Sequence, residues 1–166
     1  YFLMELPVVN HPDYVAKIND DNKFPIKKFG ALAEYLLKAG VVKNFHIPKE
    51  CSTETMQTSH SLEYINHIRN KTLDIKSQKK IGFPINDSVV RRSFVATGGT
   101  VLASKLALDA KLACNTAGGS HHATFNFGAG YCVFNDVAVA ANYLKKKLYA
   151  KKILILDLDV HQGNGN

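Results

Sequence analysis

Two short segments of this sequence combine residue types that could carry out chemistry. The first, ILDLDVHQGNG at residues 155–165, ends an aliphatic run with Asp157, Asp159 and His161. In an extended chain, residues two apart point the same way, so these three side chains converge. Carboxylate and imidazole groups together suit a divalent metal such as zinc. The spacing alone fits a loop of hydrogen-bonded polar groups equally well, so both interpretations stay open.

A pair of adjacent histidines, His121 and His122, favours the metal site. The pair follows Gly118 and Gly119, which let the backbone turn sharply after the short apolar run KLACN. Imidazoles beside a metal are natural general acids and bases, because their pKa lies near working pH. The glycine-rich stretch NFGAGYC then indicates a loop that lines a pocket, and it lacks the spacing of a phosphate loop or a dinucleotide fingerprint.

The elements that would position these groups alternate between strand and helix. The patterns predict strands at 6–9, 111–115 and 152–160, and helices within 24–40, 60–68, 87–108 and 135–148. The run KILILDLDV (152–160) is aliphatic on both faces, which is typical of a fully buried strand. This order predicts an α/β fold with a parallel sheet and helical crossovers, in which ligands gather at the carboxyl ends of the strands.

Apolar spacing also predicts which helical side chains face the core. The expected inward positions are Phe29, Leu32 and Leu36; Leu62, Ile65 and Ile68; Val90, Phe94, Val101 and Leu108; and Val137, Ala140, Ala141, Leu144 and Leu148. The third of these helices, capped near Asp87, contains the pair Gly98–Gly99. Each glycine destabilises a helix by about 1 kcal/mol relative to alanine, so we expect a close neighbour to need the space.

Composition excludes several function classes. Hydrophobic residues make up 46% of the 166 residues and charged residues 21%, as in ordinary globular domains. The formal charge is +7, but the densest lysine clusters, 145–147 and 151–152, lack interleaved aromatic residues, so we expect no nucleic-acid partner. The apolar opening YFLMELPVV is too short to span a membrane. Three widely spaced cysteines, Cys51, Cys114 and Cys132, favour a reducing, cytoplasmic location.

Three motifs resemble a known family. GGSHHA (118–123), GAGYCVFNDVAVAA (128–141) and ILDLDVHQGNG are similar to motifs of the histone deacetylase superfamily of zinc amidohydrolases, and most of all to its bacterial and class IV-like members. The resemblance runs along most of the chain. It implies the three-layer arginase/deacetylase-like fold, with a parallel sheet between helices.

The resemblance also implies roles for individual residues. Asp159 and His161 resemble two of three metal ligands, which bind zinc, with Fe²⁺ as another possible ion. His121 and His122 resemble the tandem acid/base pair that serves a metal-activated water during hydrolysis of an acyl-amide bond such as acetyl-lysine. On this interpretation no covalent acyl-enzyme forms.

Four further residues have counterparts that support this chemistry. Asp157 resembles the carboxylate that orients His121, and Asn164 takes the corresponding place behind the second histidine. Gly130 and Tyr131 resemble the wall of the acyl channel, with Tyr131 standing where phenylalanine is more usual.

In the family, a third metal-ligating aspartate and a catalytic tyrosine lie further along the chain than residue 166. We therefore expect residues 1–166 to be a single deacetylase-like domain that is incomplete at its C-terminus: an amino-terminal half, inactive alone, with an exposed apolar edge that favours oligomers. One alternative is a non-catalytic remnant that acts as a binding module or has no function. Another is the manganese ureohydrolase branch, which Gly163 disfavours because that branch has an aspartate there. The substrate class stays open among acetyl-lysine proteins, acetylated polyamines and other small acylamides.

Overall fold

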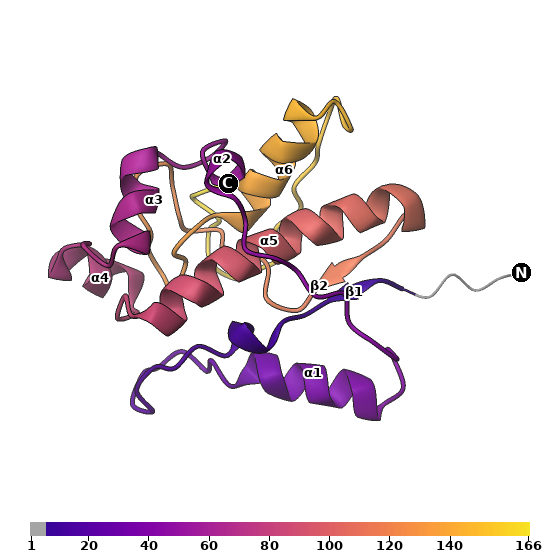
Figure 1. Cartoon of the computed structure of the whole chain (residues 1–166), viewed down its shortest axis with the longest axis horizontal. Helices are drawn as coiled ribbons and strands as arrows, with labels where there is room; N and C mark the ends of the chain where they lie inside the picture. The colour runs from indigo at the N-terminus through magenta and orange to yellow at the C-terminus, as the bar shows by residue number, and fades with distance from the viewer. Residues whose placement is uncertain (1–5) are drawn as a thin grey trace, which may run out of the picture.

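One long helix, α5 (Asp87–Ala110), organises the molecule. The computed structural model describes residues 6–166, and residues 1–5 of the apolar opening lie outside the described part. Figure 1 shows α5 crossing the centre, with α6 (Asp136–Lys146) packed along it. The short 3-10 helix η1 (Pro12–Tyr14) and both strands also contact α5. The remaining helices are α1 (Lys28–Lys38), α2 (Thr53–Met56), α3 (Leu62–Arg69) and α4 (Ile75–Ile81).

Two of the predicted strands form a small parallel sheet. β1 (Val8–Val9) pairs with β2 (Cys114–Asn115), with Val8 opposite Cys114. The sequence prediction of strands within 6–9 and 111–115 is confirmed, although each strand is only two residues long. The predicted helices are also found, whereas the short helices α2 and α4 were not predicted.

Local sequence explains why α5 is long and lies close to its neighbours. Its N-terminus is capped by the side chain of Asn86, which accepts a hydrogen bond of 2.9 Å from the amide of Val89. A Cβ atom at Gly98 would collide with the carbonyl oxygen of Lys49, and one at Gly99 would collide with the hydroxyl of Tyr14. The close neighbours expected from the glycine pair are therefore present.

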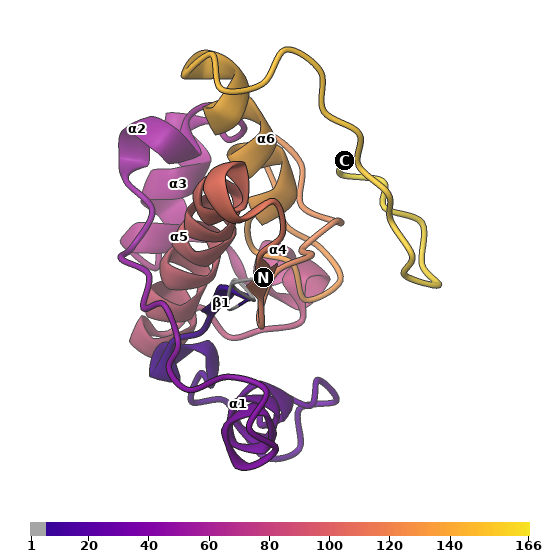
Figure 2. The same cartoon turned by 90° about the vertical axis from the view of Figure 1, so that its right-hand side faces the viewer.

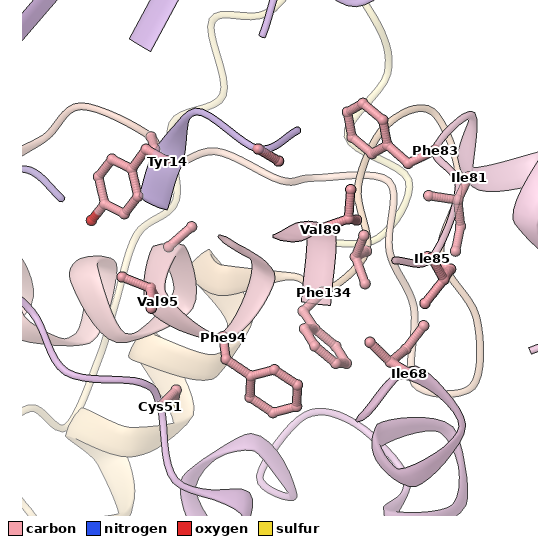
Figure 3. Close-up of a cluster of buried hydrophobic side chains, with 14 of the residues drawn as sticks. Tyr14, Cys51, Ile68, Ile81, Phe83, Ile85, Val89, Phe94, Val95 and Phe134 are labelled. Atoms are coloured by element: carbon pink, nitrogen blue, oxygen red, sulfur yellow. The ribbon is translucent and has the colours of Figure 1, made fainter. Parts of the chain in front are cut away.

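The core lies where α3, α4, α5 and the segment before α6 meet. Ile68, Ile81, Phe94 and Phe134 are at most 2% exposed and lie in one cluster (Figure 3). Most predicted inward positions are buried or half-buried. Four predictions were wrong: Leu32, Leu62 and Leu108 are 39–46% exposed, and Leu148 is 89% exposed. Leu148 lies beyond the end of α6, whereas the other three lie within α1, α3 and α5 on partly exposed faces of these helices.

The prediction of a fully buried strand at 152–160 was wrong for this chain. The segment is extended but pairs with no strand among residues 6–166, and Figure 2 shows it running outside the helical body. Ile153 and Ile155, 37% and 38% exposed, line a pocket of about 390 Å³ against α6. Leu154 and Leu158 are 89% and 85% exposed. A parallel strand is buried only by neighbours on both edges and both faces, and among residues 6–166 no strand pairs with either edge of this segment.

Within residues 6–166, no helix is both long enough and apolar enough to cross a lipid bilayer.

Candidate active site

The tandem histidines lie on a tight turn that follows β2. Gly119 has a φ of +93°, a backbone conformation that favours glycine, and it turns the chain back toward α6. His121 is buried, with 6% exposure, and His122 is half-buried. Their ring centroids are 4.2 Å apart. The turn therefore presents two imidazoles side by side, as the adjacent glycines predicted.

Each histidine forms a hydrogen bond through Nδ1 with a different residue of the C-terminal segment. His121 Nδ1 lies 2.7 Å from Asp157 Oδ2, and His122 Nδ1 lies 2.7 Å from Asn164 Oδ1. Since carboxylate and amide oxygens only accept hydrogen bonds, Nδ1 of each ring carries a proton, and in the neutral ring Nε2 keeps a free lone pair. The hydrogen bond from His121 holds the pKa of Asp157 below its usual range. The structure thus brings together the four residues predicted as the catalytic group.

The two candidate metal ligands are neighbours at the same edge. Asp159 Oδ1 lies 2.9 Å from His161 Nδ1 and 3.9 Å from His121 Nε2. A zinc ion bound at about 2.0–2.1 Å to each donor would hold a carboxylate oxygen and an imidazole nitrogen at a similar separation. Residues 6–166 contain no group of three or more His, Cys, Asp or Glu side chains arranged to hold a metal. The donor set therefore fits part of a zinc site and requires a further ligand.

The two histidines and the two candidate metal ligands line a pocket of about 480 Å³. Its wall includes both histidines, Asp159 and His161, together with Gly130 and Tyr131. A Cβ atom at Gly130 would lie 2.6 Å from His122 Cδ2, so only glycine lets the wall approach the ring this closely. The Tyr131 ring packs against Phe24, with centroids 5.0 Å apart. The predicted channel residues therefore share one cavity with the two histidines and the two candidate metal ligands.

Sequence reasoning missed the groups that hold the turn in place. Asp136 is 1% exposed and accepts hydrogen bonds from the backbone amides of Gly119 and Ser120. The side chain of its neighbour Asn135 donates to the carbonyl of Ala123. An Asn-Asp pair at the start of a helix is typical of ordinary N-terminal capping. The sequence therefore did not indicate that these two side chains bind the backbone around the histidines.

Comparison with known proteins agrees with these motifs. Residues 23–166 match the model of the histone deacetylase domain. An uncharacterized protein of Picosynechococcus sp. is 43% identical over 164 residues, which are 98% of this chain and 55% of that protein. Histone deacetylase 2 of Arabidopsis thaliana is 30% identical over 159 residues, which are 86% of this chain and 39% of that protein.

A solved structure supports the fold independently. The crystal structure of the HDA15 HD domain superposes with a TM-score of 0.82 at 22% identity, covering 98% of this chain and 49% of that one. The expected α/β fold of the arginase/deacetylase type is therefore confirmed, and the chain spans about half the length of the relatives it matches. On its motifs, its matched domain and its fold, this chain belongs to the histone deacetylase family.

Proposed function

We propose that the full-length protein, meaning the product of the complete open reading frame that contains these residues, is a zinc-dependent deacetylase. Its reaction is hydrolysis of an acyl-amide bond such as that of acetyl-lysine. One observation carries the proposal: two adjacent imidazoles, each held through Nδ1 at 2.7 Å, share a pocket with a carboxylate–imidazole pair suited to zinc.

The residues of this chain have distinct tasks in that reaction. Asp159 and His161 would hold the zinc, which when bound supplies Lewis acidity toward the acyl carbonyl and the attacking water. His121 and His122 each offer Nε2 to the pocket, so one can accept the proton of the water and one can protonate the departing amine.

The partners behind the two histidines differ in charge. Asp157 accepts the hydrogen bond of His121 Nδ1 with a carboxylate oxygen, which fixes the direction in which His121 Nε2 points. Asn164 is neutral and orients His122 through its amide oxygen. Gly130 and Tyr131 would form the wall along which the acyl chain enters.

An acetyl-lysine peptide and an acetylated polyamine, each offered to the full-length protein, test the proposal. We expect turnover of at least one substrate, loss of turnover on chelation and its return on adding zinc. Fe²⁺ is the alternative ion, and parallel reconstitution would identify it by higher turnover. Zinc-replete protein that is inert toward both substrates and toward other small acylamides would instead favour a non-catalytic binding module.

A further inference from the structure

The carboxylate of Asp136 is buried directly beneath the turn that carries the tandem histidines. Asp136 is the first residue of α6 and is 1% exposed. Its oxygens accept hydrogen bonds from the amides of Gly119, at 3.1 Å, and Ser120, at 2.7 Å. The residue after Ser120 is His121, so the contact fixes the backbone immediately before the histidine pair.

A second contact fixes the other side of the pair. The side chain of Asn135 donates to the carbonyl oxygen of Ala123 at 3.3 Å. The backbone amide of Asn135 donates to Nε2 of the buried His60 at 2.9 Å. The start of α6 therefore holds the histidine segment at residues 119–120 and again at residue 123.

A chain of hydrogen bonds orients the Asp136 carboxylate from the opposite side. The hydroxyl of Thr100, on α5, donates to Asp136 Oδ2. Thr100 Oγ1 in turn accepts from Asn115 Nδ2 at 2.9 Å, and Asn115 Oδ1 accepts from the Tyr14 hydroxyl at 2.9 Å. Every donor in this chain points toward the carboxylate, so η1, β2 and α5 together fix its position.

We propose that Asp136 is a positioning residue for His121 and His122, and that Thr100 orients it. Asp136 acts through the backbone of the turn: a buried anion accepting two amide bonds and a hydroxyl bond leaves the turn one conformation. The effect on catalysis rests on the proposed function, whereas the positioning of the histidines by Asp136 does not depend on it.

Substitutions at two residues separate positioning from mere folding. Asp136→Asn replaces one acceptor oxygen by an NH₂ group. The NH₂ group cannot accept a hydrogen bond, so the variant cannot accept from both backbone amides and from the Thr100 hydroxyl as Asp136 does. Thr100→Val removes only the hydroxyl, and Thr100→Ser keeps it. Thr97→Val is the control on the same helix, because Thr97 is more deeply buried on α5 than Thr100 but its hydroxyl donates only to the carbonyl of Ser93 in its own helix.

The first readout is the imidazole itself and requires no activity. Long-range ¹H–¹⁵N spectra of the full-length protein report which nitrogen of each histidine carries the proton. We expect a single Nδ1–H form for His121 in the wild type and in Thr97→Val and Thr100→Ser. Mixed tautomers should appear in Asp136→Asn and Thr100→Val. Wild-type histidine spectra in either of these two variants would overturn the proposal. If Asp136→Asn does not fold, Thr100→Val alone decides the question.

The second readout is catalysis. Misplacing a reacting group by about 1 Å can lower a rate by about 100-fold, so we expect kcat to fall roughly tenfold to 100-fold in Thr100→Val with KM unchanged. Thr97→Val should match the wild type. A rise in KM at constant kcat would contradict a positioning role. If the wild-type protein hydrolyses no acylamide, the proposed function fails, and the histidine spectra still decide whether Asp136 positions the pair.

Discussion

The buried histidine beneath α6 should make the stability of the protein fall on mild acidification. His60 is 1% exposed; its Nδ1 donates to the Thr124 carbonyl at 2.8 Å, and its Nε2 accepts from the Asn135 amide at 2.9 Å. Burial lowers the pKa of His60 from 6.5 to about 4. Both ring nitrogens are used in the neutral form, so a proton added to Nε2 would break the bond to Asn135.

The size of the effect follows from linkage. Between pH 6.5 and pH 4 the unfolded chain binds a proton at this residue that the folded chain does not, so the free energy of unfolding falls as pH falls. Above pH 6.5 His60 is neutral in both states and adds no pH dependence. The shift corresponds to about 3 kcal/mol in full, of which about 2 kcal/mol is lost by pH 5.

Urea unfolding of the full-length protein at pH 8, 7, 6 and 5 measures this contribution. His60→Gln should be less stable than the wild type at pH 8, with a pH dependence smaller by about 2 kcal/mol between pH 8 and pH 5. His46→Gln is the matched control, because the His46 side chain is exposed, and it should keep the full wild-type slope. A His60→Gln variant with the wild-type slope would refute the reasoning.

Three further results are expected. In the full-length protein, His122→Ala should keep its zinc and lose about 10²- to 10⁴-fold in turnover, because a general acid–base group is removed; unchanged turnover on an acetyl-lysine peptide would contradict its role. Gly99→Ala should lower the free energy of unfolding by about 1–3 kcal/mol, since its Cβ would collide with the Tyr14 hydroxyl; Gly30→Ala, which meets only a Val15 methyl, is the control, and equal effects would refute the packing argument. The isolated 166-residue chain should neither bind zinc tightly nor hydrolyse acetyl-lysine, and light scattering should show oligomers or aggregates through its exposed aliphatic segment; a monomer with chelator-sensitive turnover would contradict this.

The chemistry of the site was largely readable from the sequence. Residue types and spacing indicated one polar site made of two groups of residues. The first group is the two histidines that follow one strand, and the second is the Asp-x-Asp-x-His run that follows another apolar segment. The structure brings His121 against Asp157 and His122 against Asn164. These two pairings were expected only from the resemblance to the family, because the paired residues lie 36 and 42 positions apart along the chain.

Two features could not be read in this way, for physical reasons. An aliphatic run such as 152–160 reads as a buried strand, but burial depends on neighbours that the run itself does not encode, and Leu154 is 89% exposed here. Asp136 reads as a helix-capping acid, whereas its partners Thr100 and Ser120 lie 36 and 16 residues away along the chain. Only the packing of α6 on α5 brings these groups together.

The central claim is that Asp159 and His161 hold a catalytic zinc ion. The most direct test is elemental analysis of the full-length protein and of its Asp159→Ala and His161→Ala variants, with turnover of an acetyl-lysine peptide measured on the same samples. The wild type should contain one zinc ion per chain, and each variant should lose both the zinc and the turnover. Stoichiometric zinc in either variant would contradict the assignment of these two ligands.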